Sequence, residues 1–139
     1  MKRIREVMTR QPWTVQLDDS LSVARRMIAE REIHHLPVLD GGLVVGIVTE
    51  PDLAHAADHL GTVEDVVESA LTVDDDTPID EVLDVMMTRR ADAVIVTNEG
   101  VVEGIFTATD AVRELRDLLR LPRVDEIASS AHRHAIEKL

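Results

Sequence analysis

The chain has no cysteine, no tyrosine and only one tryptophan and one phenylalanine among its 139 residues. Without cysteine it can form neither a disulfide framework nor a thiolate nucleophile. With so few aromatic residues, the core has to be built from Val, Ile, Leu, Ala and Met. Small branched side chains of this kind suit β-sheets that are covered by helices.

Basic residues are scarce as well, because 15 Lys and Arg stand against 27 Asp and Glu, for a net charge of −12. A nucleic-acid backbone demands clustered positive charge, so nucleic acid is not expected as the main partner. No apolar run approaches the ~18 residues that would indicate a membrane span. A P-loop, a GxGxxG motif and a nucleophile elbow are also missing, so we expect a cytoplasmic protein that is not an enzyme.

One short motif is present twice. The sequence GIVTEPD at residues 46–52 and the sequence GIFTATD at residues 104–110 share glycine, two apolar residues, threonine and aspartate at identical spacing. The same offset of 58 residues relates Thr14 to Thr72 and Val38 to Val96, without a gap. This pattern is typical of an internal duplication.

Each copy has the hydrophobic spacing of a β-α-β-β-α unit. In the first copy the expected elements are a short strand at residues 14–17, a helix from 21 to about 30–32, strands at 35–39 and 43–49, and a helix that begins near Pro51. The second copy repeats this order, with its last helix at residues 108–120. Asp40-Gly41-Gly42 predicts a tight hairpin turn.

A unit of roughly 58 residues cannot bury both its hairpin and its helices alone, so the two units are expected to share a core. The predicted fold is α/β (α+β), with two β-α-β-β-α repeats packed sheet to sheet in pseudo-twofold symmetry. We predict repeat 1 at residues 1–60, repeat 2 at residues 61–120, and an amphipathic C-terminal helix within the tail at residues 121–139.

The repeated motif allows two interpretations. Thr49 and Thr107 end a strand, and Asp52 and Asp110 fall in the first turn of the next helix. A threonine followed three residues later by a carboxylate is an ordinary capping pattern. The same groups could also bind a nucleotide, because a hydroxyl and unpaired N–H groups suit phosphate while a carboxylate accepts hydrogen bonds from a ribose diol.

The ordered combination of HLPVLDGGLVVGIVTEPDL in the first unit and ADAVIVTNEGVVEGIFTATDAV in the second resembles a tandem pair of CBS domains, also called a Bateman module. The resemblance covers residues 1 to about 120. It implies two clefts between the repeats that bind AMP, ADP, ATP or S-adenosylmethionine, and a regulatory role exerted on a separate target protein. It also implies a homodimer formed through the outer helices.

By this resemblance, Asp52 and Asp110 would hold ribose hydroxyls and Thr49 and Thr107 would contact phosphate. The other predicted nucleotide-binding residues, near the strand starts, are Pro12, Trp13, Thr14, Ile33, His34, His35, Leu36, Asp92, Ala93 and Val94. Pro12 to Thr14, Ile33 and Leu36 are assigned to the Thr49 site, and their counterparts in the second repeat to the Thr107 site.

The two sites are not expected to be equivalent. His34 and His35 are assigned to the Thr49 site and Asp92 to the Thr107 site, so phosphorylated nucleotide is expected to prefer the first. Arg89 and Arg90 could favour the second. The rival hypothesis is a nucleotide-free interaction or scaffold module in which the Thr and Asp residues only cap helices.

His55 and His59 are four residues apart on an expected helix, which is a spacing that metal sites use. No third ligand accompanies them in the sequence, so no metal site is predicted.

Overall fold

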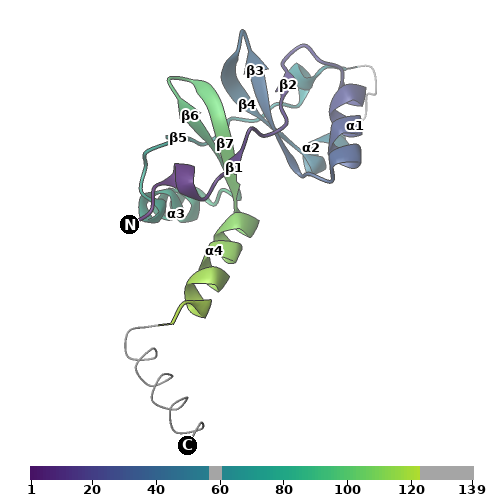
Figure 1. The fold of residues 1–139 in the computed structure, drawn as a ribbon. Helices are drawn as coiled ribbons and strands as arrows, with labels where there is room; N and C mark the ends of the chain where they lie inside the picture. The colour runs from purple at the N-terminus through teal and green to yellow at the C-terminus, as the bar shows by residue number, and fades with distance from the viewer. Residues whose placement is uncertain (57–60, 123–139) are drawn as a thin grey trace, which may run out of the picture.

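The computed structural model describes residues 1–56 and 61–122, and it has the expected order of elements in both halves (Figure 1). The first half contains η1 (Ile4–Glu6), β1 (Thr9–Arg10), β2 (Val15–Gln16), α1 (Leu21–Arg31), β3 (His35–Asp40), β4 (Leu43–Thr49) and α2 (Glu50–His55). The second contains η2 (Val63–Asp65), β5 (Thr72–Asp74), α3 (Ile79–Arg89), β6 (Ala93–Asn98), β7 (Val101–Thr107) and α4 (Ala108–Arg120). The predicted tail helix and His59 lie outside the described residues.

The helices begin and end where local chemistry favours it. The Ser20 hydroxyl accepts a hydrogen bond of 3.2 Å from the Val23 N–H, so Ser20 is the N-cap of α1. Glu32 and Arg90 follow α1 and α3 in the left-handed conformation, each with φ of 53°. A left-handed residue at this position lets the chain leave the helix and return its N–H to the last turn.

Both hairpins turn through two central residues with positive φ. These residues are Gly41 and Gly42 in the first hairpin, with φ of 60° and 84°, and Glu99 and Gly100 in the second, with φ of 51° and 81°. Positive φ at both central positions is the conformation of the type I′ turn, whose twist matches that of the flanking strands. The predicted hairpin at residues 40–42 is confirmed.

The strands form two sheets, ordered β2-β3-β4 in the first half and β1-β7-β6-β5 in the second. In each sheet the hairpin is antiparallel, and the short strand that precedes the helix pairs with it in parallel. Ile47, Ala93, Ile95 and Ile105 are buried between the two sheets. The expected sheet-to-sheet packing is therefore confirmed (Figure 1).

Two short segments cross from one half to the other. Ile4 is completely buried in the core of the second half, with Val94 and Phe106, and β1 pairs with β7. Val63 is completely buried in the core of the first half, with Leu36. In the sequence, the segment around Ile4 precedes the sheet of the first half but completes the core of the second, and the segment around Val63 precedes the strands of the second half but completes the core of the first. The predicted repeat boundary at residue 60 therefore stays a prediction.

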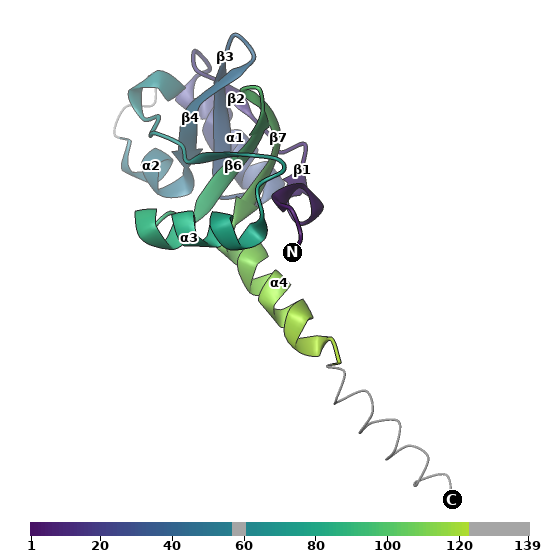
Figure 2. The ribbon, with the colours of Figure 1, turned by 90° about the vertical axis from the view of Figure 1, so that its left-hand side faces the viewer.

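Helix α4 extends away from the rest of the molecule (Figures 1 and 2). Its apolar residues Val112, Leu115, Leu118 and Leu119 are each more than half exposed. Across residues 1–56 and 61–122, no helix has both the length and the apolar character that crossing a bilayer would require.

Candidate ligand-binding cleft

Both Thr–Asp motifs form reciprocal capping boxes. The Thr49 N–H donates to the Asp52 carboxylate over 3.1 Å, and the Asp52 N–H donates back to the Thr49 hydroxyl over 3.3 Å. Thr107 and Asp110 repeat the pair at 2.9 and 3.3 Å. The capping interpretation of the motif is confirmed, and it leaves open whether either box also binds a ligand.

The second box carries two further hydrogen bonds that the first lacks. The Thr107 hydroxyl donates to Asp110 over 3.1 Å, and the Arg113 guanidinium donates to the other carboxylate oxygen over 2.9 Å. Asp110 is only 8% exposed, whereas Asp52 is half-buried. The residue in the first repeat that corresponds to Arg113 is His55, whose ring Nδ1 lies 2.7 Å from the Pro51 carbonyl oxygen instead. The Asp110 carboxylate is thus occupied, whereas within the described ranges 1–56 and 61–122 no cation forms an ion pair with the Asp52 carboxylate.

A cleft of about 450 Å³ lies between the two repeats beside Thr49. The first repeat contributes His35, Ile47 and Thr49, and the rest of the lining comes from residues 68–71 and 89–93. This volume falls in the range of about 300–1,000 Å³ that small-molecule pockets occupy. Strand β3 positions His35 and strand β4 positions Thr49, because these two residues are paired at the end of the hairpin.

Charged groups of both signs line this cleft. The His35 Nε2 lies 3.3 Å from a carboxylate oxygen of Asp92, a contact that joins the two repeats. Arg89 and Arg90 stand at the end of α3 with exposed side chains. Glu68 adds a further carboxylate on the wall next to Thr49.

The pKa of Glu68 is raised above its ordinary value. The main cause is the negative charge of Asp52, and burial, a side-chain hydrogen bond with Asp52 and the charge of Asp92 act in the same direction. Each of these effects disfavours the ionised form of the carboxyl group. Asp52 itself is not part of the lining of this cleft. It lines a separate pocket of about 290 Å³ with Pro51, His55, Ala56 and Val66, and its charge acts on Glu68 from there.

The predicted division of residues between the sites was wrong. Asp92 and Ala93 were assigned to the Thr107 site, but they line the cleft beside Thr49 together with Ala91. The offset of 58 residues identifies equivalent positions in the two repeats. It does not tell whether a residue of the second repeat lies beside Thr107 of its own repeat or beside Thr49 of the other. Asp92 lies at the Thr49 site and contacts His35, and Arg89 and Arg90, which were expected to favour the other site, line this cleft as well. The predicted preference of phosphate for the Thr49 site therefore loses the charge difference on which it was based.

Other predicted residues are distributed over several places. Leu36 and Val94 are fully buried in the two cores, so their side chains do not line a cleft, and a contact through their backbone amides stays a prediction. Trp13 is 49% exposed, and the Arg31 guanidinium carbon lies 4.0 Å from its ring centroid. Pro12, Trp13 and Thr14 connect β1 to β2 and are not part of the lining of the Thr49 cleft.

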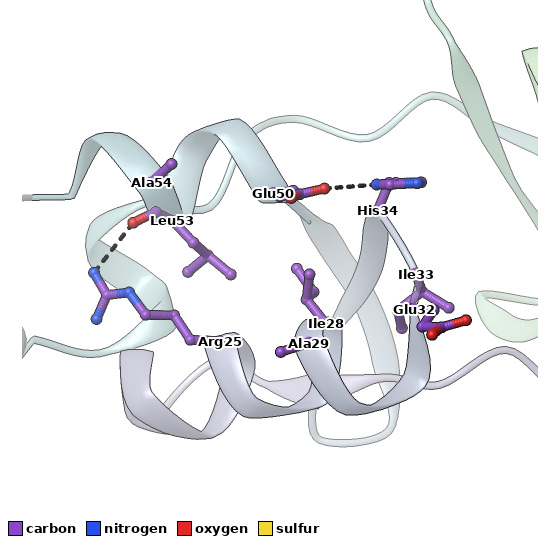
Figure 3. A pocket seen from close by; sticks show the side chains of 9 residues that line it. All are labelled: Arg25, Ile28, Ala29, Glu32, Ile33, His34, Glu50, Leu53 and Ala54. Atoms are coloured by element: carbon purple, nitrogen blue, oxygen red, sulfur yellow. Dashed lines mark hydrogen bonds and ion pairs between the residues drawn. The ribbon is translucent and has the colours of Figure 1, made fainter.

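His34 and Ile33 line a different pocket, of about 460 Å³, between α1 and α2 on the outside of the first repeat (Figure 3). The His34 Nδ1 lies 2.6 Å from a Glu50 carboxylate oxygen at one end of this pocket. At the other end the Arg25 guanidinium donates to the Leu53 and Ala56 carbonyl oxygens, at 3.1 and 3.2 Å, and closes the last turn of α2. Between these ends the lining is largely apolar, so the pocket differs in character from the cleft beside Thr49.

Glu68 was not among the residues predicted from the sequence, because it lies outside the repeated motif. A sign of its position was present, however. Val63 and Val67 correspond to Ile4 and Met8 in packing, which is an offset of 59 residues rather than 58. The duplication therefore extends into the segment before each short strand, with one residue more in the first copy.

Within residues 1–56 and 61–122, no group of three or more histidine or acidic side chains is arranged to hold a metal ion.

Comparison with known proteins agrees with the duplicated architecture. The family model described as CBS domain matches residues 4–59 and 63–117. The inosine-5′-monophosphate dehydrogenase of Nitrosopumilus maritimus is 33% identical over 113 residues, which cover 79% of this chain and 24% of that protein. The same enzyme from Thermoplasma acidophilum is 28% identical over 113 residues, covering 81% of this chain and 23% of that protein. The chain thus spans about a quarter of the length of these curated relatives.

A solved structure of similar extent is the CBS domain pair of protein MJ0100, in complex with 5′-methylthioadenosine and S-adenosyl-L-methionine. It matches with a TM-score of 0.78 at 28% identity, over 84% of this chain and 98% of that chain. The similarity therefore extends over both repeats and their relative placement.

Proposed function

The chain belongs to the CBS domain family, of which it carries two copies, and from this premise we propose that it is a regulatory module that senses an adenosyl ligand. The observation that carries the proposal is the cleft beside Thr49, which both repeats line and which has the volume of a small-molecule site. The ligand classes considered are AMP, ADP, ATP and S-adenosylmethionine. The similar pair that holds two adenosyl compounds supports this choice.

In this proposal the Asp52 carboxylate accepts hydrogen bonds from the ribose hydroxyls, since Asp52 is half-buried and forms no ion pair with another residue among 1–56 and 61–122. The Thr49 hydroxyl and the polar edge formed by His35 and Asp92 orient the rest of the ligand. Ala93 and the backbone around Ala70 supply the apolar contacts for adenine. Binding between the repeats would change their relative placement, which is how a target protein would detect the ligand.

The second predicted site, with Thr107 and Asp110, is the weaker one in this proposal, because Arg113 already occupies the Asp110 carboxylate. By the pseudo-twofold relation, Pro12, Trp13, Thr14, Ile33 and His34 would belong near that site. This assignment remains a proposal based on equivalent positions.

Titration calorimetry of the full chain with AMP, ADP, ATP, S-adenosylmethionine and 5′-methylthioadenosine tests the function. At least one adenosyl ligand is expected to bind, and the Asp52→Ala variant is expected to lose at least about tenfold in affinity. A thermal shift should accompany binding, since a ligand at a hundredfold excess over Kd adds about 2.7 kcal/mol to the free energy of unfolding.

The Asp110→Ala variant is the matched control, because it removes the equivalent residue from the other repeat. Unchanged affinity in this variant supports the Thr49 cleft as the site. Loss of binding in Asp110→Ala with retention in Asp52→Ala would place the ligand in the other half. If the chain melts cooperatively but binds none of the five compounds, the rival function of a scaffold module is favoured. The two complete capping boxes are consistent with that function.

We further propose that the module forms a homodimer in the cytoplasm and acts on a separate target protein. A groove of about 530 Å³ between α3 and α4 supports an interface on the second repeat. Its apolar lining includes Ile79, Leu83, Leu115 and Leu118, and exposed apolar surface of this kind marks interaction sites. Sedimentation velocity of the full chain measures the assembly directly.

A further inference from the structure

We propose that Glu68 sets the charge of the ligand that the Thr49 cleft accepts, favouring adenosyl compounds with an uncharged or cationic 5′ substituent over those with a phosphate. The inference rests on the proposed function, because it concerns the selectivity of the same cleft. Glu68 is neither part of the repeated motif nor one of the residues that the family resemblance implied.

The backbone of Glu68 is held firmly at the wall of the cleft. Its N–H donates to the Ile47 carbonyl and its carbonyl accepts from the Ile47 N–H, both over 2.9 Å. The contact is close because residue 46 is glycine, at which an added Cβ would lie 2.5 Å from the Glu68 carbonyl oxygen. Thr49 follows Ile47 by two residues on the same strand and lines the same cleft. The Glu68 side chain therefore starts from a fixed point near the place where the 5′ group of an adenosyl ligand would lie.

The charges around Glu68 make this part of the cleft unfavourable for an anion. Asp52 and Asp92 both act on Glu68 and raise its pKa, so the charges of two neighbouring carboxylates already repel that of Glu68. A phosphate would add further negative charge at short range, whereas a sulfonium or ammonium group would relieve the repulsion.

Basic side chains line the same cleft. His35 is engaged by Asp92. Arg89 and Arg90 belong to the end of α3 and have exposed side chains, and the side chains of Glu68 and Asp92 are exposed as well. Water and salt therefore screen charges of both signs, and the proposal depends on Glu68 being the charged residue whose backbone is fixed beside the strand that carries Thr49.

The other repeat has no carboxylate at the corresponding position. Thr9 pairs with Ile105 as Glu68 pairs with Ile47, and an added Cβ at Gly104 would contact the Thr9 carbonyl oxygen as one at Gly46 would contact that of Glu68. The next residue is Arg10 in that repeat and Ser69 beside Glu68. The residue at this position is therefore acidic beside Ile47 and not beside Ile105. Selection by charge is accordingly expected in the Thr49 cleft and not as a general property of the fold.

The test compares 5′-methylthioadenosine, S-adenosylmethionine and AMP, which share the adenosyl group and differ in the charge of the 5′ substituent. Titration calorimetry near neutral pH measures each affinity for the wild-type chain, for Glu68→Gln and for Glu64→Gln, an exposed neighbour as matched control. We expect the wild type to prefer 5′-methylthioadenosine over AMP by at least about tenfold. In Glu68→Gln, AMP is expected to gain about tenfold and 5′-methylthioadenosine to change by less than about twofold.

Two results would overturn the proposal while leaving the proposed function intact. One is a wild-type chain that binds AMP more tightly than 5′-methylthioadenosine. The other is an unchanged ratio of their affinities in Glu68→Gln, or the same change in Glu64→Gln. Failure of the wild type to bind these three compounds and also ADP and ATP would instead remove the proposed function, and the selectivity with it.

Discussion

The two repeats use one motif in two chemical settings. In the second repeat, the Asp110 carboxylate is buried and receives hydrogen bonds from Thr107 and Arg113. In the first, the Asp52 carboxylate is half-buried, forms no ion pair with any residue that the structure describes, and interacts with another carboxyl group, that of Glu68. Duplication preserved the capping box in both halves. The surroundings changed, so that a guanidinium group engages one carboxylate and a second carboxyl group lies beside the other.

The largest expected effect concerns the two motif glycines. At Gly46 an added Cβ would lie 2.4 Å from a methyl carbon of Val67 and 2.5 Å from the Glu68 carbonyl oxygen. At Gly104 the neighbours are the flexible Met8 side chain at 2.4 Å and the Thr9 carbonyl oxygen at 2.7 Å. We expect Gly46→Ala to cost about 3 kcal/mol and Gly104→Ala about 2 kcal/mol in the free energy of unfolding, measured by urea denaturation.

Val45→Ala is the control for this pair, because Val45 is an exposed residue of the same strand as Gly46 and its loss should cost less than about 1 kcal/mol. Equal losses of stability in the two glycine variants would mean that the branched Val67 side chain opposes an added Cβ no more than the flexible Met8 side chain does. Costs below about 1 kcal/mol for both would contradict the close approach itself.

The second prediction sharpens the comparison of the carboxylates. Asp110→Ala is expected to lower the free energy of unfolding by about 2 kcal/mol, because it leaves the Thr107 N–H and the Arg113 guanidinium without their acceptor. Asp52→Ala removes a cap but also relieves the repulsion with Glu68, so a cost of about 1 kcal/mol is expected. Denaturant unfolding of both variants without ligand measures the difference.

The control for this second pair is Asp117→Ala, an exposed position on the same helix as Asp110 that should change stability by less than about 0.5 kcal/mol. If Asp52→Ala proved the more destabilising of the two carboxylate variants, the division into a structural and an available carboxylate would be wrong.

The smallest effect is a pH dependence. The pKa of Glu68 is raised in the folded chain, so its protonated form is favoured by folding and the wild type loses stability as the pH rises through that pKa. Glu68→Gln cannot ionise and is expected to melt higher than the wild type at neutral pH, by no more than about 2 °C. The gap should close below the ordinary glutamate value of 4.5. Melting curves from pH 4 to 8 test this, and a gap that widens on acidification would give the opposite sign.

Local pattern was sufficient for most of the fold. The spacing of apolar residues located α1 and α3, and the Asp-Gly-Gly turn located the first hairpin, because these features depend on neighbours in the sequence. The pairing of β1 with β7 could not be predicted in this way, since two-residue strands have no pattern of their own and their partners lie far along the chain.

The site was predicted less completely. Thr49, Asp52, Thr107 and Asp110 occupy the positions that the motif indicated, at the end of a strand and in the first turn of a helix. The grouping of the other residues depends on which strand ends of the two sheets lie close together. The spacing of residues in the sequence does not indicate this. Glu68 could not be predicted because a single bridge to Ile47, and not a helix or a strand, determines its position.

The exchange of the two crossing segments also sets the order in which the two cores can close during synthesis. Ile4 precedes by nearly a hundred residues the side chains of Val94 and Phe106 that help to bury it. The growing chain therefore keeps this apolar side chain uncovered until Phe106 has been translated, and contacts between such distant residues form slowly. The first half, by contrast, can close its core as soon as Val63 has emerged. The core that contains Val63 should thus form before the core that contains Ile4, and the segment around Ile4 should be put in place only after β6 and β7 have been made.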